Sequence, residues 1–372
     1  MMESMEDMMR KLNFCEKTAI SLKPVEEEYI LHMDIQQSAD TPDSATDDRL
    51  LACSSSSYNI RLHARHNMAT LQQIDAHKNV ISGIKFAHND THLLFSSSWD
   101  GSIRCWDIRT DFKKPAQEFA GCDKCLLCLD INSSDSKIAA GTESVEKEVE
   151  LKIWDRRQNV LLTDFTDSHM DDITQVSFHP TNENLLASGS TDGLVCKFDL
   201  AEDTEENSLL LTMNSLSSVA FVGWCSPNYD QIYCTTHVDT FHVWDSTEGD
   251  LLYQMTNVKE KLKDKVEYIV DYIGSEKTDH WMVLAGQKNG NLSILEFSND
   301  KDVEIISSLS GGHTGIIRCL HWDKMTSSLV TGGEDSMVCL WSTTTAEENK
   351  EVNKLKIKAH KLKTLPRIKA GQ

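Results

Sequence analysis

Residues 77–107 read HKNVISGIKFAHNDTHLLFSSSWDGSIRCWD, and this stretch decides the fold because the chain repeats it. Within it, apolar and small residues alternate in three runs, VISGIKF, HLLFSSS and SIRCW, and turn-forming residues separate the runs. Alternation at a period of two residues is typical of β-strands, because successive side chains of a strand point to opposite faces. The stretch therefore predicts a meander of three strands joined by tight turns.

Two further stretches, residues 169–199 and 313–342, repeat this pattern closely. Each copy keeps a His before its first strand, a Ser or Thr on its second strand, an Asp in the next turn and an aromatic residue on its third strand. The three sets are His77, Ser96, Asp100 and Trp106; His169, Ser188, Asp192 and Phe198; and His313, Thr331, Asp335 and Trp341. Buried polar groups need hydrogen-bond partners, so we expect each set to link His to the hydroxyl, the hydroxyl to Asp, and the end of the chain to the indole N–H. Since Phe198 has no N–H, the second set should have one bond fewer.

Weaker copies fill the intervals between the clean ones. In the copy that ends at Trp244, Thr235 and Asp239 are expected at the hydroxyl and turn positions, but no His precedes them. The third-strand position recurs about every 45 residues, at His63, Trp106, Trp154, Phe198, Trp244, Leu295 and Trp341. Seven repeats of this length predict one closed ring of seven sheets.

The Trp-Asp pairs at the ends of the third strands and the recurring His, Ser or Thr, Asp and Trp resemble the WD-repeat (WD40) family. This resemblance implies an all-β fold, a seven-bladed β-propeller of WD repeats, over residues 50–342. It also implies a closure in which an N-terminal strand completes the last blade, which would leave no free sheet edge at the junction. We expect a strand over residues 13–23, assign the closing role to its second half, TAISLK at 18–23, and expect residues 29–36 to open the first blade.

These expectations divide the chain into three parts. Residues 1–12 are Met-rich and acidic, and we expect them to be flexible, with a short amphipathic helix as the alternative. Residues 13–345 form the propeller, with no second folded domain. Residues 346–372 form a basic tail, which from Val352 onward has no acidic residue and contains Lys354, Lys356, Lys358, Lys361, Lys363, Arg367 and Lys369.

The composition is that of a water-soluble protein, with 40% hydrophobic and 26% charged residues. No apolar run approaches the roughly 18 residues that a membrane span requires, and the acidic start of the chain lacks the apolar core of a signal peptide. We therefore expect an intracellular protein, cytoplasmic or nuclear or both, without membrane contact. The eleven Cys are spread over the strands and are expected to be reduced.

The repeated His, Ser and Asp are the residue types of a hydrolase triad, but a structural role explains them better. They recur in three equivalent repeats, and the hydroxyl is expected to bridge His and Asp rather than act as a nucleophile. Cys122, Cys125 and Cys128 have a spacing that metal sites use, but in an alternating strand Cys125 and Cys128 point to opposite faces, and no fourth ligand is near. We predict no enzymatic activity, no cofactor and no metal.

Two insertions add charge to one face of the predicted ring. Residues 143–150, ESVEKEVE, are acidic and include Glu146 and Glu148, whereas residues 257–265 carry Lys259, Lys261, Lys263 and Lys265. A further acidic loop, residues 201–208, is expected on the opposite face. Each of these runs has the alternative interpretation of a solvated loop without a partner.

The resemblance implies that partners bind the narrow face around the central channel, where the residue before each turn Asp should lie. These residues are Trp99, Thr191, Val238, Lys288 and Glu334, and the candidate partner-binding residues are Trp99, Asp171, Asp172, Lys288 and Glu334. The net charge of −21 favours a protein or peptide partner with Lys or Arg and disfavours nucleic acid except through the tail.

The predicted function is that of an interaction scaffold or adaptor, a monomeric propeller within a larger intracellular complex. One alternative is a nuclear reader of basic, histone-like peptides. The other is an RNA-associated assembly factor that uses the basic tail. Fold alone does not decide between these three functions.

Overall fold

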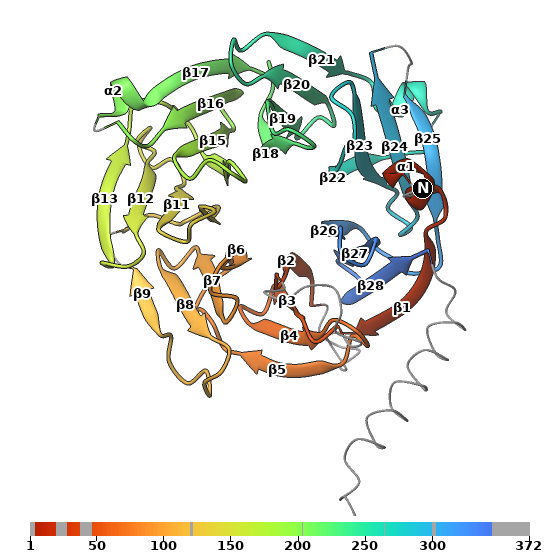
Figure 1. Cartoon of the computed structure of the whole chain (residues 1–372), viewed down its shortest axis with the longest axis horizontal. Coiled ribbons are helices and arrows are strands. Elements are labelled where there is room, and N and C mark those ends of the chain that lie inside the picture. Colours follow the sequence, from red (N-terminus) through yellow and green to blue (C-terminus); the bar gives the residue numbers. More distant parts are fainter. Residues whose placement is uncertain are drawn as a thin grey trace, which may run out of the picture.

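The structure is a computed structural model that describes residues 4–19, 28–37, 47–119, 122–202, 204–263, 265–299 and 303–343. It contains seven four-stranded antiparallel sheets, which form a ring of blades around a central channel (Figure 1). The predicted all-β, seven-bladed β-propeller is thereby confirmed. Between residues 246 and 281 the described residues contain two strands, the start of a third and one four-residue helix, so no further domain interrupts the ring there.

Each blade is described from its innermost to its outermost strand. Blade one contains β2 (Ile30–Ile35), β3 (Leu50–Ser55), β4 (Ile60–Ala64) and β5 (Thr70–Ile74), and blade two contains β6 (Ile81–Phe86), β7 (Leu93–Ser98), β8 (Ile103–Asp107) and β9 (Gln117–Phe119). Blade three contains β10 (Asp130–Ile131), β11 (Lys137–Gly141), β12 (Leu151–Asp155) and β13 (Val160–Phe165), and blade four contains β14 (Ile173–Phe178), β15 (Leu185–Ser190), β16 (Leu194–Asp199) and β17 (Leu209–Asn214). Blade five contains β18 (Val219–Cys225), β19 (Gln231–Thr236), β20 (Phe241–Asp245) and β21 (Leu251–Met255), and blade six contains β22 (Tyr268–Gly274), β23 (His280–Gly286), β24 (Leu292–Ser298) and β25 (Glu304–Leu309). Blade seven contains β26 (Ile317–Asp323), β27 (Ser328–Gly333), β28 (Met337–Ser342) and β1 (Asn13–Ala19).

The ring closes through its N-terminal strand, as expected from the sequence. β1 pairs antiparallel with β28, from Asn13 opposite Ser342 to Ala19 opposite Met337. Two distant parts of the chain therefore complete one sheet, and the last blade needs residues from both. Residues 20–23, which we also assigned to this strand, lie outside the described residues.

The start of the chain is ordered by a short helix, α1 (Met5–Arg10), so the prediction of a flexible segment is wrong for residues 4–12. Ser4 Oγ accepts a hydrogen bond from the backbone N–H of Asp7 and caps the helix. Met5 and Met9 are buried in a cluster that also contains Ile306 of β25, and α1 packs against that strand. The alternative, a short amphipathic helix, is confirmed. Residues 1–3 lie outside the described residues.

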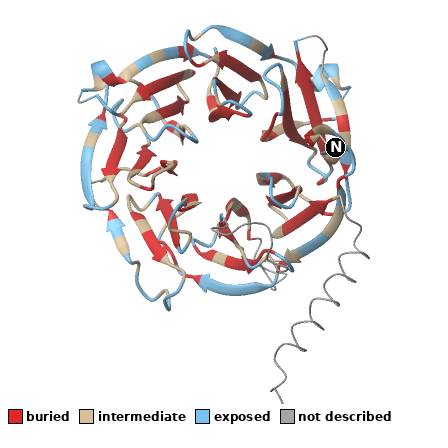
Figure 2. Ribbon diagram, in the orientation of Figure 1, coloured by how far each residue is buried: buried red, intermediate tan, exposed pale blue. Residues whose placement is uncertain are grey.

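Apolar side chains fill the gaps between neighbouring blades, so the core is a ring of clusters rather than one centre. Figure 2 shows the same distribution, with buried residues on the inner strands and exposed residues on the outermost ones. The third-strand residues that mark the repeat, such as Trp106, Trp154 and Leu295, are all buried. The turns between the second and third strands lie close to the next blade: a Cβ at Gly101, which has φ +78°, would lie 2.8 Å from the carbonyl oxygen of Cys122.

Two short helices occur in loops: α2 (Glu205–Ser208) before β17 and α3 (Val258–Lys261) before β22. No helix among the described residues is long and apolar enough to span a membrane. The basic tail, residues 346–372, and most of the polar loop at 38–49 lie outside the described residues.

Candidate interaction face

The three predicted sets of His, hydroxyl, Asp and aromatic residue do come together, but in a different order. In blade two, His77 Nε2 lies 2.7 Å from Ser96 Oγ, and its Nδ1 lies 3.1 Å from a carboxylate oxygen of Asp100. The Trp106 indole N–H donates to Ser96 Oγ over 3.0 Å. The imidazole, not the hydroxyl, therefore bridges to the Asp, and the hydroxyl bridges His and Trp.

Blades four and seven repeat this arrangement. His169 lies 2.7 Å from Ser188 Oγ and 3.2 Å from Asp192, and Phe198 adds no bond, as expected. In blade seven, His313 lies 2.8 Å from Thr331 Oγ1 and 3.0 Å from Asp335, and the Trp341 indole N–H donates to Thr331 over 2.8 Å. The sequence spacing identifies the right residues because three segments lie on one side of each blade. These are the loop before the first strand (the entry loop), the second strand, and the turn that follows the second strand.

These networks hold the turns that carry the interaction face. Asp100 also accepts hydrogen bonds from the backbone N–H of Lys78 and from the Ser102 hydroxyl, so one carboxylate ties the entry loop to the turn. Burial works to raise the pKa of Asp100, but the hydrogen bonds from His77 and Ser102 outweigh it and hold that pKa well below its usual range.

The order Asp, His, Ser is also that of a hydrolase triad, but the hydroxyl lies in the wrong place for that chemistry. Ser96 and Ser188 are fully buried, and Ser96 Oγ already accepts the Trp106 N–H. A nucleophile needs a free approach to its substrate. The networks are therefore explained by turn stability.

Blade five departs from the sequence prediction by one residue. In blade two, Ser96 lies opposite Arg104, which is two residues before Trp106. In blade five, the residue two before Trp244 is His242, and it lies opposite Cys234 rather than Thr235. Val238 consequently takes the turn position expected for Asp239, and the buried Thr235 Oγ1 has no hydrogen-bond partner among the described residues. The sequence itself indicates this shift of register, because Trp244 follows Asp239 by five residues, whereas Trp106 follows Asp100 by six.

Three of the five positions before the turn Asp make the same backbone contact with their entry loop. The Trp99 N–H donates to the carbonyl of Val80 in its entry loop, and Thr191 and Glu334 make the matching bonds to Asp172 and Ile316. In blade five the matching bond comes from His237, which donates to Ser218 over 3.0 Å. His237, not Val238, therefore occupies the position of Trp99.

Trp99 stands beside the entry loop of blade three. Its side chain is 44% exposed, although the strand before it is fully buried. The backbone N–H of Leu126 donates to Ser98, the neighbour of Trp99, and the N–H of Glu143 donates to Cys125 on the other side of the same loop. The turn that carries Trp99 is therefore connected, through the backbone of one short loop, to the acidic insertion.

The acidic insertion is in turn joined to blade four. Ser144 N–H donates to the Asp172 carboxylate over 2.8 Å, which brings residues 143–148 next to the entry loop that carries Asp171. We define the acidic arc as four exposed residues whose carboxylates have no cationic partner among the described residues. The arc consists of Asp123, Glu146, Glu148 and Asp171. It runs from the neighbourhood of Trp99 across blades three and four.

The other predicted partner-binding residues do not belong to this arc. Glu334 forms an ion pair with Arg318, and Asp172 is only partly exposed, so neither meets the definition of the arc. Lys288 is exposed in the turn of blade six, and its backbone N–H is held by Glu267. Of the five candidates, the structure groups Trp99 with Asp171 and Asp172, and places Lys288 and Glu334 on blades six and seven.

The basic insertion is partly bound to the ring. Lys259 Nζ, on α3, lies 2.8 Å from the carboxylate of Asp239 in the turn of blade five. Asp239 also accepts the backbone N–H of Ile269. This pair ties the lengthened entry loop to a turn that lacks the His and Asp of the clean repeats.

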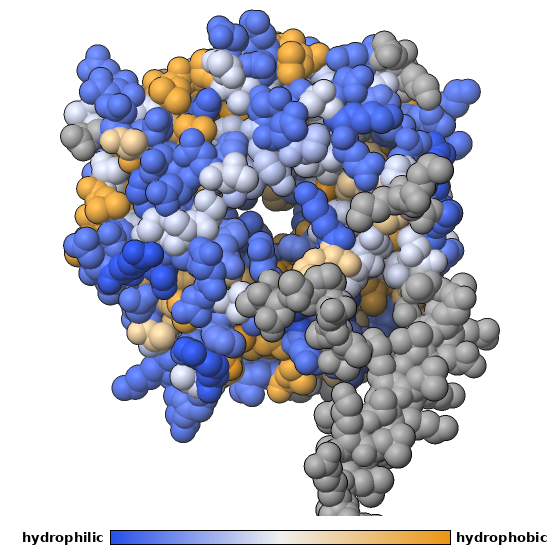
Figure 3. Space-filling model, viewed as in Figure 1, coloured by the Kyte–Doolittle hydropathy of each residue, from blue (hydrophilic) through white to orange (hydrophobic). Residues whose placement is uncertain are grey.

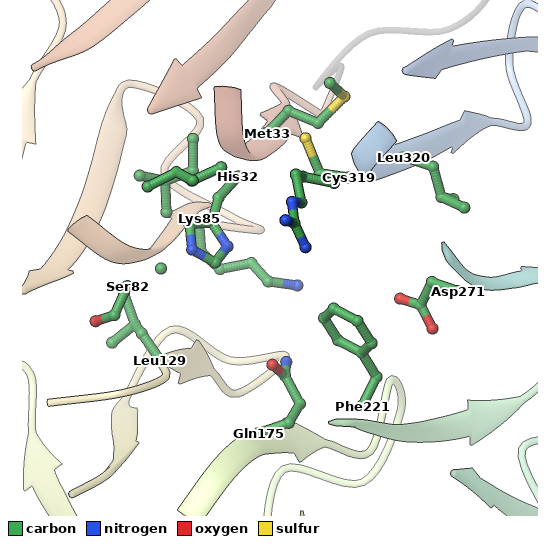
Figure 4. Close-up of a pocket in the computed structure, with 14 residues that line it drawn as sticks. His32, Met33, Ser82, Lys85, Leu129, Gln175, Phe221, Asp271, Cys319 and Leu320 are labelled. Carbon is green, nitrogen blue, oxygen red and sulfur yellow. The ribbon is translucent and has the colours of Figure 1, made fainter. Parts of the chain in front are cut away.

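Sequence reasoning missed the polar lining of the channel. A cavity of about 140 Å³ is bordered by inner-strand residues of all seven blades, among them His32, Lys85, Gln175 and Asp271 (Figure 4). Lys85 Nζ lies 3.4 Å from Asp130, and burial raises the pKa of Asp271 to about 6. The lining contains both cations, Lys85 and Arg318, and a carboxylate, Asp271, so it does not carry one sign of charge.

The three closely spaced Cys all lie in the entry loop of blade three, before β10 begins at Asp130. Cys122 Sγ donates to the carbonyl of Lys124, and Cys128 is buried with its Sγ 3.4 Å from the carbonyl of Ile173. Burial raises the pKa of the Cys125 thiol to about 11. Within the part of the chain that the structure describes, no three His, Cys, Asp or Glu side chains gather as a metal site.

Comparison with known proteins gives matches over most of the chain. The family model "WD domain, G-beta repeat" matches residues 68–107, 160–199 and 303–342, which contain the three clean repeats. The order of intact and altered repeats resembles WD repeat-containing protein 89, and the WD repeat-containing protein 89 homolog of Dictyostelium discoideum is 27% identical over 87% of this chain and 89% of its own length. The WD repeat-containing protein GTS1 of Arabidopsis thaliana is 26% identical over 82% of this chain and 80% of its own. A guanine nucleotide-binding protein subunit beta-like protein of Encephalitozoon cuniculi is 36% identical, but over only 35% of this chain and 37% of its own.

Proposed function

We propose that this chain, which is a WD40-repeat β-propeller, is a non-enzymatic scaffold or adaptor of an intracellular complex. It binds a Lys- or Arg-bearing protein segment at Trp99 and the acidic arc. The single observation that carries the proposal is the exposed indole of Trp99 on the turn that packs against the entry loop of blade three, together with four exposed carboxylates of blades three and four that have no cationic partner among the described residues. WD40 propellers are generally interaction scaffolds, which agrees with this assignment.

Trp99 supplies the anchor. The backbone of Trp99 is held by its bond to Val80 and by the His77 and Asp100 network, so little backbone entropy is lost when a partner covers the partly exposed indole. An aromatic face also attracts a guanidinium or ammonium group, by about 0.5–1 kcal/mol at an exposed site. Trp99 should therefore dominate the affinity.

The acidic arc gives this surface its preference for a positively charged partner. Exposed ion pairs contribute only about 0–1 kcal/mol each, and salt screens them. Four carboxylates on one side of the ring instead raise the association rate of a basic partner and disfavour an acidic one. Lys78 and Lys147 are also exposed on this face and moderate the field without cancelling it.

Affinity purification of the tagged full-length chain from its native cell extract tests the proposal. Wild type should be compared with Trp99→Ala, with Glu148→Gln plus Asp171→Asn, and with a chain that lacks residues 352–372. Tyr58→Ala is the matched control, because Tyr58 is an exposed aromatic residue in the corresponding turn of blade one.

The proposal expects partners that are lost with Trp99→Ala, weakened at low salt by the carboxylate variant, and retained by Tyr58→Ala and by the shortened chain. If only removal of residues 352–372 abolishes association, the tail is the working surface. The RNA-associated alternative then applies when ribonuclease removes the remaining partners. If the recovered partners are histones, the chain is the nuclear reader of basic, histone-like peptides.

A further inference from the structure

The outer wall of the propeller carries apolar side chains at one repeated position. In five blades the outermost strand contains a bulge opposite the third-strand marker residue, such as Trp154 opposite Leu161 or Trp244 opposite Leu251. The bulged residues are Leu71, Leu162, Leu210, Leu252 and Ile306. A bulge turns its side chain away from the regular pleat. The same backbone feature thus presents an aliphatic side chain on successive blades.

One of these positions is covered by the chain itself. Ile306 of blade six is only 6% exposed, because α1 packs against β25 and brings Met5 and Met9 into the same cluster. Leu162, Leu210 and Leu252, on the next three blades around the ring, have no such cover and are 38–50% exposed. The molecule therefore shows in blade six what fits this position: one apolar face of a short amphipathic helix.

The uncovered leucines recur on the outermost strands of blades three, four and five. We define the leucine belt as Leu161, Leu162, Leu210, Leu251 and Leu252, which are all at least 37% exposed. A groove of about 240 Å³ joins Leu162 to Leu200 and Glu202 at the start of the next blade, and a Cβ at Gly249 would lie 3.4 Å from Leu211. Figure 3 shows apolar patches at the periphery where Figure 1 places β13, β17 and β21.

Four exposed acidic residues lie beside the leucine belt, whereas Lys137 in the groove is engaged by Asn184 and the carbonyl of Leu200, and Arg157 is exposed before β13. Glu202, Glu206, Glu248 and Asp250 are exposed in the loops that lead into β17 and β21, and none has a cationic partner among the described residues. Basic side chains that flank an apolar helix face would be attracted to them. Leu71 of blade one, in contrast, is surrounded by the polar Thr70, Gln72 and Gln73 and stands alone.

We propose that the leucine belt is a second docking surface, independent of Trp99, and that its occupant is an amphipathic helix of a partner protein with Leu- or Met-type residues on one face and Lys or Arg beside them. The helix lies across the outer strands of blades three to five, as α1 lies on blade six. A partner could then be held at the outer wall while its basic segment reaches the interaction face.

The test uses the full-length chain and a fluorescent synthetic peptide of Leu and Lys with leucines at positions i, i+3, i+4 and i+7. Fluorescence anisotropy should show binding that weakens by about 100-fold in the triple variant Leu162→Ser, Leu210→Ser, Leu252→Ser. Leu71→Ser is the matched control and should bind as wild type. The wild type, the triple variant and Leu71→Ser all keep Trp99 and the acidic arc, so a difference between them reports on the leucine belt alone and is distinct from failure of the proposed function.

Three results would overturn the proposal. The first is equal affinity for the wild type and the triple variant, which would mean that the peptide responds only to the net charge. The second is equal binding of a peptide with the same composition in scrambled order, or of a Leu and Glu peptide with the same leucine spacing. The third is a concentration-dependent dimer of the wild type, detected by sedimentation and lost in the triple variant, which would make a second copy of this chain the occupant.

Discussion

The carboxylate of Asp323, at the end of β26 in blade seven, accepts hydrogen bonds at 3.1 and 2.6 Å from the guanidinium of Arg49, which precedes β3 in blade one. Arg65 Nη2 lies 3.4 Å from the same carboxylate, and all three side chains are almost fully buried. The ring is therefore closed twice, by the pairing of β1 with β28 and by this ion cluster between the last and the first blade.

Asp323→Ala should destabilise the ring strongly. The substitution leaves the buried guanidinium of Arg65 without a carboxylate, whereas Arg49 keeps its pair with Asp47, and removing one partner of a buried ion pair costs about 3–5 kcal/mol. Urea unfolding followed by tryptophan fluorescence measures the loss. Asp111→Ala, which removes an exposed partner of Lys113, is the control and should leave the midpoint unchanged. Similar midpoints for both variants would show that the cluster does not close the ring.

Trp106→Ala and Trp341→Ala should each lower the free energy of unfolding by about 3–5 kcal/mol, because each removes a buried indole and a donor to the network hydroxyl. Trp106→Phe should cost about 1 kcal/mol, since it removes the N–H and keeps most of the ring. Trp99→Ala should change stability little and affect binding instead. Equal losses for Trp99, Trp106 and Trp341 in chemical unfolding would make Trp99 a packing residue.

His63 makes the protein sensitive to acid. Burial lowers the pKa of His63 to about 4, whereas an unfolded His titrates near 6.5, so the unfolded chain binds the proton first as the pH falls. Stability from this group is present above about pH 6.5 and is lost progressively as the pH falls toward 4, by about 3 kcal/mol in all.

His63→Phe, which places in blade one the residue that blade four has as Phe198, should remove this part of the acid sensitivity. The measurement is the unfolding free energy of the wild type and the variant between pH 7 and pH 4.5. His66→Asn, at an exposed position nearby, is the control. A loss on acidification that is the same in the wild type and His63→Phe would contradict the assignment.

Met9→Ala should cost about 2–4 kcal/mol, as expected for a fully buried side chain. The reason is that Met9 joins α1 to the cluster around Ile306 and Trp341. Differential scanning calorimetry should show a lower Tm for Met9→Ala, and little change for Arg10→Ala on the exposed side of the helix. An unchanged Tm for Met9→Ala would mean that α1 does not contribute to the fold in solution.

The sequence predicted the ring and the clean repeats because period-two alternation and a fixed repeat length are local properties of the chain. It selected His77, Ser96, Asp100 and Trp106 correctly, but not their order, since spacing does not determine which atom of a side chain faces its neighbour. The error at Val238 has a different origin: Thr235 and Asp239 imitate the pattern one residue late, and only the strand pairing of Cys234 with His242 resolves the register.

What depends on distant parts of the chain could not be predicted in this way. α1 is stabilised because Met5 and Met9 are buried against blade six. The sequence of residues 1–12 does not indicate that this blade offers a site for them. Glu334 looked like a free acid of the interaction face, but Arg318 pairs with it across the sheet. The exposure of Trp99 and its proximity to the acidic arc likewise follow from the packing of blade two against blade three.

The most direct measurement of the central claim is selection of random displayed peptides on the immobilised full-length chain at low and at physiological salt, with Trp99→Ala and Tyr58→Ala chains as parallel targets. The account predicts that the selected peptides are enriched in Lys and Arg, that Trp99→Ala retains few of them at either salt concentration, and that Tyr58→Ala retains them all. Peptides without basic enrichment, or peptides that bind wild type and Trp99→Ala equally well, would contradict it.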